Sequence, residues 1–510
     1  MKKHQPWKAY TFKLLLAAGA LIAIIFIAGL VASVALRNKL VTELSKGDGS
    51  VNSVQINFFT RSISLDHLVL DSETSDLPLR GNINRVKFSG ISVFKLLTGK
   101  GIQIKNITLD SGDVAFTLSK RDSSKKTNLS YPIAVESFTV NKLRFSIKKD
   151  SVLQLKAIAN MSFGSFKYDS TFSFQGLGKV FHHLTGSFSD LSFSEATGFY
   201  KISADKIEFN SNDQSLIIDS IKLSPNYGKI EFGQAKGKQL TRIDLSIPRI
   251  LLSRLNYKSL FDSILSVSKL SVEEPKLQVF RDKRLPFIKK DVVPMPMYSL
   301  LKLPFKIKID SVSIQQATIV VEEIAEDAKT PGYVVFNNVK GLLTGLNNQA
   351  QIPTMLNATG NFMKTGLIEA EFMFPIDTTK NYTAKGKISN VPFNELNTMT
   401  EAAASLKFES GLLNNLYFNF SYNDYKSLGE VQLNYKDLKI VSLNQDKSKQ
   451  KIKSALINVL LKDTKDKSTP VKDRKGKIEI DRDRKRFIFN LWWKSLQSGL
   501  KDSIMGSAKK

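Results

Sequence analysis

Few residues of this chain have the types and spacing that catalysis or metal binding requires. There are four histidines and no cysteine, so a thiolate metal site, a disulfide or a cysteine nucleophile is impossible. His182 and His183 are adjacent, and neighbours on a strand point to opposite faces, which makes them a poor metal pair. No GxSxG, HExxH or phosphate-loop motif occurs, and the carboxylates are scattered rather than paired. We therefore predict no catalytic residue, no metal site and no cofactor, and we expect a protein that is not an enzyme.

The pattern that does recur is apolar. It reads apolar-x-apolar, two polar residues, apolar-x-apolar, with copies that begin at residues 102, 133, 202, 265 and 307 and looser copies at 63 and 216. In the copies at 102, 133, 265 and 307 a further apolar pair follows five residues later. A sheet of such strands has one continuous apolar face, which must be covered, paired or filled by something apolar. The candidate lipid-contacting residues are Ile102, Ile104, Ile107, Leu109, Leu265, Val267, Leu270, Val272, Ile307, Ile309, Val312 and Ile314.

The step of three across each polar pair breaks strict alternation. Either a tight hairpin turns there, or an extra residue bulges and restores the phase. The observed pairs lack the glycine that two-residue hairpins favour, so a bulged, twisted strand fits better, followed by a turn and a second strand. Which member of each alternating pair faces inward stays open. The predicted fold is all-β with a few short helices: an N-terminal transmembrane helix followed by an extended, twisted β-groove of repeated strand units.

Helical spacing is rare after the N-terminal segment. It predicts an amphipathic helix over residues 248–267, a short one over 91–97, another over 393–406 and a last one over 490–505. The last helix offers a possible membrane-interface set, because Trp beside Lys is typical of interfacial helices. That set is Trp492, Trp493, Leu496 and Leu500. The alternative is that this helix caps the open end of the sheet.

Residues 14–36 carry no charge and are long enough to cross a bilayer. Four lysines precede them, which favours a cytoplasmic N-terminus and export of the rest. A cleaved signal peptide is the alternative, with small residues at Ser33 and Ala35. We expect a single-pass protein of the inner (cytoplasmic) membrane, with most of the chain in the periplasm.

Composition shifts divide the chain further. The proline-rich stretch before residue 305 predicts a linker or rim, and the Lys-, Arg- and Asp-rich stretch after 445 predicts partial disorder. The predicted parts are a cytoplasmic tail (1–13), the anchor (14–36), an N-terminal part of the β-groove (37–282), the linker or rim (283–304), a C-terminal part of the β-groove (305–445), the charged segment (446–486) and an amphipathic helix (487–510).

The formal net charge of +27 favours anionic partners. Beside a membrane these are phospholipids or other anionic lipids, and export argues against nucleic acid. The alternative is that lysines simply keep outward strand faces and edges soluble.

A succession of strand phrases carries a family resemblance. It comprises VNSVQIN at 51–57, the apolar phrases at 63–70, 86–97 and 102–116, SVSKLSVEEPKLQVFRD at 266–282, GKISNVPFNELN at 386–397, SGLLNNLYF at 410–418 and GEVQLNYKDL at 429–438. After an N-terminal anchor, this order resembles AsmA-like envelope proteins, the group that includes TamB-like proteins. The resemblance implies a taco-shaped β-groove related to bridge-like lipid-transfer proteins, which project from the inner membrane and carry phospholipid acyl chains. It implies no catalytic residues.

We therefore predict a membrane-anchored periplasmic protein that handles or transfers phospholipid along an apolar β-groove and supports outer-membrane lipid homeostasis. The first alternative is a structural or assembly factor for outer-membrane protein biogenesis that acts through contacts with envelope proteins. An envelope enzyme or glycan-binding protein is disfavoured by the missing site chemistry. If Ile104 or Ile309 faces the groove, Asp at either position should abolish lipid co-purification and leave the fold intact.

Overall fold

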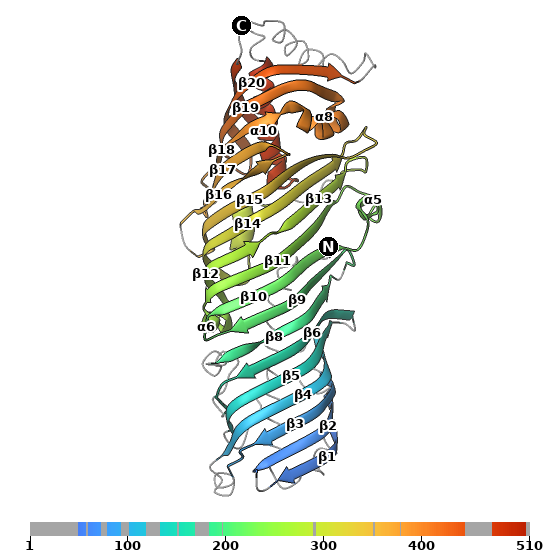
Figure 1. The fold of residues 1–510 in the computed structure, drawn as a ribbon, viewed down its shortest axis with the longest axis vertical. Helices are drawn as coiled ribbons and strands as arrows, with labels where there is room; N and C mark the ends of the chain where they lie inside the picture. The colour runs from blue at the N-terminus through green and yellow to red at the C-terminus, as the bar shows by residue number, and fades with distance from the viewer. Residues whose placement is uncertain are drawn as a thin grey trace. The chain divides into compact units, whose positions relative to one another are not determined.

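The structure is a computed structural model of the chain (Figure 1). It describes residues 49–57, 60–72, 79–92, 101–118, 133–149, 152–168, 183–195, 197–288, 292–349, 352–377, 379–443 and 472–505. The predicted anchor at 14–36, His182 and the predicted helical turn after Ser92 lie outside these ranges. Within them, no helix has both the length and the apolar character that crossing a bilayer demands.

The chain is mostly β, as predicted, and divides into two compact units. The first contains described residues up to Lys222 and Arg249–Ser268, and the second contains Leu223–Pro248 and the described residues from Lys269 onward. The first unit holds β1 (Gly49–Asn57), β2 (Ser62–Ser72), β3 (Leu79–Ser89), β4 (Ile102–Leu118), β5 (Ile133–Lys149), β6 (Val152–Phe163), β7 (Phe166–Tyr168), β8 (Leu184–Ser194), β9 (Tyr200–Asn210) and α6 (Tyr257–Phe261). Three strands contribute residues to both units: β10 (Ser215–Pro225), β11 (Thr241–Leu255) and β12 (Ile264–Glu273).

The second unit contains the remaining elements. They are α5 (Lys229–Gln234), β13 (Lys276–Asp282), α7 (Pro296–Leu301), β14 (Lys306–Ile324), β15 (Gly332–Asn347), β16 (Thr354–Phe362), β17 (Gly366–Phe374), β18 (Tyr382–Pro392), η2 (Phe393–Leu396), α8 (Asn397–Ala404), β19 (Leu406–Tyr422), β20 (Lys426–Ser442), β21 (Lys472–Asp481) and α10 (Ile488–Met505). From β14 to β21 each strand pairs antiparallel with the next, and Figure 1 shows β14 to β20 in this order.

Copies of the sequence repeat lie side by side in register. Strands β4 and β5 run parallel, so that Ile102 faces Ile133 and Leu109 faces Val140. In the second unit β13 and β14 also run parallel, and Leu277 faces Ile319. Equivalent apolar positions therefore become neighbours, and the apolar face continues from one copy to the next.

Each of the four longer copies contains one residue in the left-handed region, at the tenth position of the copy. These residues are Ser111, Lys142, Glu274 and Gln316, with φ between 46° and 53°. Such a residue restores the phase of a strand after an odd step, because it rotates the backbone without ending the ladder. The copies at 102, 133 and 307 are consequently single strands of 17, 17 and 19 residues.

The predicted continuous strand across the polar pair is therefore confirmed, and the predicted turn is wrong in three of these four copies. Only the copy at 265 divides into two strands, β12 and β13. The division falls at Glu274 and Pro275, because proline has no N–H to donate to the ladder.

The predicted helices fare unequally. The one over 393–406 is confirmed as η2 followed by α8, and the C-terminal one as α10. The helix predicted over 248–267 is wrong: β11 runs through its first part, five residues form α6, and β12 follows. The apolar spacing of three between Leu252 and Leu255 imitates a helix, but it arises where the strand changes phase, at Arg254 with φ of 55°.

Two other predicted segments are described in part. Residues 283–304 carry α7 and, where described, no strand. Of the charged segment, residues 472–481 form β21, and 446–471 lie outside the described ranges.

The left-handed residue of β14 gives a stability test with an adjacent control. Gln316 is exposed and has φ of 53°, whereas its exposed neighbour Gln315, which lies in the same bulge, has no positive φ. We expect Gln316→Val to lower the free energy of unfolding by about 1–2 kcal/mol, because a β-branched side chain is strained at positive φ. Gln315→Val should change it by less than about 0.5 kcal/mol. Urea denaturation followed by circular dichroism measures both, and equal midpoints would contradict the assignment.

Candidate functional site

The second unit has one sheet face that is apolar across its width. The cross-strand register from β14 to β21 aligns a single row of side chains on this face: Val312, Leu343, Leu356, Phe372, Ala384, Phe420, Gly429 and Ile478. Directly opposed residues share a face of the sheet. The row therefore samples the same surface from one end to the other, and we call this surface the inner face of the second unit.

Helix α10 covers one end of the inner face. Phe420 and Ile478 are 2% and 0% exposed, and Leu491 of the helix is buried with them in one hydrophobic cluster. Trp492 marks the limit of this cover, because its ring stacks on Phe372 of β17 with centroids 4.5 Å apart. Helix α10 therefore caps one end of the sheet, which was the alternative prediction for this helix.

The aromatic rings beneath α10 are packed away from water. Tyr382 and Tyr422 lie opposite each other on β18 and β19, with ring centroids 5.4 Å apart, and Trp492 meets Tyr422 edge-on. Burial raises the pKa of Tyr382 to about 12. It also raises the pKa of Tyr422, against a smaller opposing effect of the Trp492 indole N–H. Both phenols therefore stay neutral and serve as packing groups.

Small residues let α10 approach the sheet closely. A Cβ atom on Gly476 of β21 would lie 2.0 Å from the carbonyl oxygen of Gly499, and one on Gly499 would lie 2.8 Å from Val431. The Ser495 hydroxyl donates to the Ser427 hydroxyl at 2.8 Å, and both serines are fully buried. The cover therefore depends on residues that lack bulk at the contact.

The other end of the inner face is only half-buried. Val312, Leu343, Leu356 and Phe372, on β14 to β17, all keep part of their surface exposed. Four strands span about 14 Å at ~4.8 Å per strand. The next row on the same face is made of small residues, Gly341, Ala358, Ala370 and Gly386, and the Phe418 ring packs against the last of them. Such a surface can bind an aliphatic chain, because the side chains of the row from Val312 to Phe372 are all apolar.

The first unit buries its apolar face. Ile104, Ile107 and Leu109 are 0% exposed and Ile102 is 8% exposed, within a cluster that extends from β2 to β6. Burial of this kind is a packed core. We therefore expect Asp at Ile104, or at Ile309 with 5% exposure, to destabilise the fold, so the prediction of lipid loss with an intact fold loses its premise at both positions.

The remaining predicted candidates are distributed between core and surface. Val267, Ile307 and Ile309 are buried, whereas Leu265, Leu270, Val272, Val312 and Ile314 are half-buried. Of the predicted membrane-interface set, Trp492, Leu496 and Leu500 pack against the core of the second unit, and Trp493 is 45% exposed.

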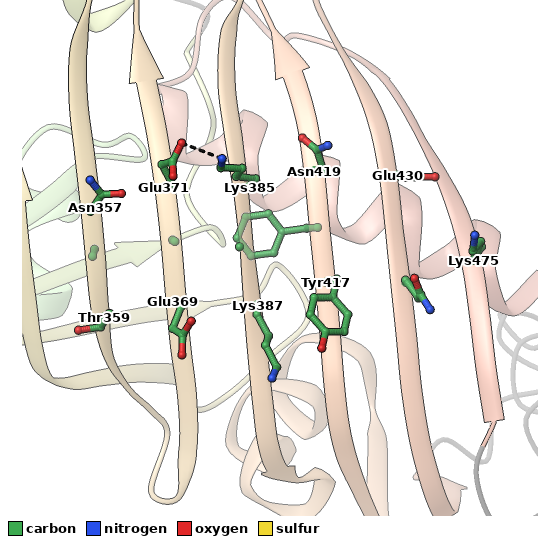
Figure 2. A pocket seen from close by; sticks show the side chains of 15 residues that line it. Asn357, Thr359, Glu369, Glu371, Lys385, Lys387, Tyr417, Asn419, Glu430 and Lys475 are labelled. Atoms are coloured by element: carbon green, nitrogen blue, oxygen red, sulfur yellow. Dashed lines mark ion pairs between the residues drawn. The ribbon is translucent and has the colours of Figure 1, made fainter.

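The outer face of the second unit carries a shallow depression with charged side chains around it, which Figure 2 shows from close by. Its charged side chains are Glu369, Glu371, Glu430, Lys385, Lys387 and Lys475, three acids against three bases. Lys385 pairs with Glu371 at 2.9 Å, and the Lys387 ammonium lies over the Tyr417 ring. Charges that neutralise each other on an exposed surface are typical of a solvated strand face. Nowhere in the described ranges do three His, Asp or Glu side chains gather as metal ligands would.

The structure identifies residues that the repeat pattern missed. Leu343, Leu356 and Phe372 lie on β15, β16 and β17, which contain no copy of the repeat. The sequence signal for these residues is the alternation of side chains over 354–362 and 366–374. Such alternation predicts strands, but it does not say which strands stay uncovered. No known family model matches the chain, and no curated protein matches its sequence.

The glycine contact under α10 can be tested by adding one methyl group. We expect Gly476→Ala to lift the helix, since the new Cβ would collide with backbone that cannot move aside. Uncovering several buried apolar side chains should cost about 3 kcal/mol or more. Two of the three tryptophans are in α10, so their emission should shift to the red and the helix should become sensitive to protease.

Gly341→Ala is the matched control for this test. It adds the same methyl group to a strand of the same unit, where the nearest atom would be 3.6 Å away. An unchanged emission spectrum in Gly476→Ala would contradict the proposed close approach.

Proposed function

We propose that this chain binds the acyl chains of phospholipids, or of other anionic lipids, on the half-buried end of its inner face, and that it carries lipid in the bacterial envelope. The observation that carries the proposal is the contrast along one row of side chains. The row is buried at Ala384, Phe420 and Ile478, at the end that α10 covers, and only half-buried from Val312 to Phe372. An apolar surface that remains open beside a covered one is an expected binding surface for an apolar ligand.

The resemblance to AsmA-like proteins supports the same proposal from the sequence. With residues 14–36 as an anchor, the protein would reside in the inner membrane and expose its sheet to the periplasm. Transfer of phospholipid along the sheet would then support outer-membrane lipid homeostasis. No catalytic step is part of the proposal, because binding and release of acyl chains require only an apolar surface.

A second candidate is an assembly factor that acts through protein contacts in outer-membrane protein biogenesis. The burial of Ile104, Ile107 and Leu109 favours it, because the first unit fills its apolar face with its own side chains. The two candidates differ in what occupies the inner face of the second unit. Lipid on that face supports the first candidate, and a lipid-free folded protein supports the second.

The test is mass spectrometry of lipids that remain bound to the full chain after extraction and purification in a lipid-retaining polymer. We expect several phospholipid molecules per chain, and Leu343→Asp should reduce this number by at least half, because a carboxylate on the apolar face is costly to bury against an acyl chain. Leu342→Asp is the matched control. Leu342 is the preceding residue of β15, is 47% exposed and lies on the outer face, so its lipid content should equal that of the wild type.

Circular dichroism must show that both variants fold. Equal lipid content in folded Leu343→Asp and Leu342→Asp would refute binding on the inner face. Lipid that remains in both variants at a low, fixed number would instead belong to the membrane anchor.

A further inference from the structure

A second surface of the same unit combines exposed apolar side chains with arginines. We call it the corner patch, and it is formed by the segment after β13, the β20 hairpin and the start of α10. Its apolar members, between 36% and 69% exposed, are Phe287, Ile288, Val292, Tyr425, Phe487, Phe489 and Trp493. Phe489 and Trp493 are four residues apart on α10 and so lie on one side of the helix, away from Leu491 in the core.

Backbone hydrogen bonds hold these segments together. The N–H of Val293 donates to the carbonyl of Arg484 at 2.8 Å, and the N–H of Arg482 donates to the carbonyl of Tyr425 at 2.6 Å. The Arg482 side chain is 1% exposed, and it joins Asp424 to the carbonyl oxygen of Val293. Arg482 is therefore a buried structural residue that holds the segments of the corner patch together.

The neighbouring arginines lie at the surface on aromatic rings. The Arg484 guanidinium is 4.9 Å from the centre of the Tyr425 ring, and the Arg486 guanidinium is 3.9 Å from that of Phe287. Stacking keeps each cation beside an aromatic group, and each also pairs with a carboxylate, Arg484 with Asp424 and Arg486 with Asp483, so an anionic headgroup would have to share these cations.

The patch has a surplus of positive charge. Residues 281–287 contribute three bases and Asp282, and residues 482–486 contribute four bases and Asp483. The facing acids are Asp424, which pairs with Arg482 and Arg484, and Glu323, which pairs with Lys283. Seven bases against four acids leave a net charge of +3, in contrast to the balanced outer depression.

We propose that the corner patch docks on the surface of a phospholipid bilayer that contains anionic headgroups. Phe, Tyr and Trp are the residues that insert at the level of the headgroups, and stacked arginines beside them attract anionic lipids. A folded domain gains nothing in solubility from seven exposed apolar side chains in one place. The patch shares Trp493 with the interface set predicted from sequence, whereas the other three members of that set, Trp492, Leu496 and Leu500, face the sheet.

Docking is independent of lipid carriage on the inner face, and it is tested by capture of vesicles. The full chain is held through its N-terminus on donor vesicles of phosphatidylcholine, and dye-labelled acceptor vesicles are added. Acceptors of phosphatidylcholine with phosphatidylglycerol should co-sediment with the donors, and acceptors of phosphatidylcholine alone should do so several-fold less. Phe487→Ser with Phe489→Ser should reduce capture about tenfold or more, and Arg484→Gln with Arg486→Gln about fivefold per charge removed.

The matched control is Leu342→Ser with Leu367→Ser. These two leucines, on β15 and β17, are 47% and 46% exposed and have no stacked arginine, so their replacement should leave capture unchanged. Failure of the wild type to capture anionic acceptors would overturn the proposal and point to a protein partner for the patch. Equal capture by the wild type and the folded Phe487, Phe489 variant would overturn it as well. Neither result bears on the lipid content measured for the inner face.

Discussion

The structure depends on one apolar face that continues from strand to strand. Its longest strands cannot alternate apolar and polar side chains strictly from end to end and still keep that face continuous. A strand twists as it lengthens, and 17 to 19 residues of strict alternation would turn the apolar side chains away from their neighbours. Residues in the left-handed region correct this drift. His67, Ser111 and Lys142 lie on β2, β4 and β5 of the first unit, each between rungs that pair normally, so that the phase changes together in neighbouring strands.

The opposite face of the first unit shows the same coordination in polar side chains. Asp66 of β2 accepts from Arg85 of β3 at 2.8 Å, and this contact holds the pKa of Asp66 below its usual value. Asp113 of β4 likewise pairs with Arg144 of β5, which lowers the pKa of Asp113. These pairs are exposed and contribute little stability. They fix the register, because a slip of one residue would put each charge on the apolar face.

The sequence was informative where a local rule decides the outcome. The repeat indicated the strands, and the step of three in residues 102–109 indicated a bulge rather than a hairpin because the polar pair Lys105-Asn106 has no glycine. It misled over 248–255, the first part of the predicted helix, where a phase change within β11 has the spacing of a helix. It also could not tell Ile104 from Val312, which occupy equivalent types of position. The first is in a packed core and the second is half-buried, and only long-range packing, such as the position of α10, decides between them.

The excess of basic residues has more than one physical role. On the outer face of the second unit, lysines are matched by glutamates, as in the pair Lys385–Glu371. Among the described strands β21 pairs with β20 alone, and its lysines guard an edge that would otherwise offer free backbone groups to another chain. Asp502 of α10 closes part of that edge by accepting from the N–H of Lys477. Solubility and edge protection explain these lysines. They do not explain the arginines that stack on exposed rings such as Phe287, because there a cation lies directly beside exposed apolar surface.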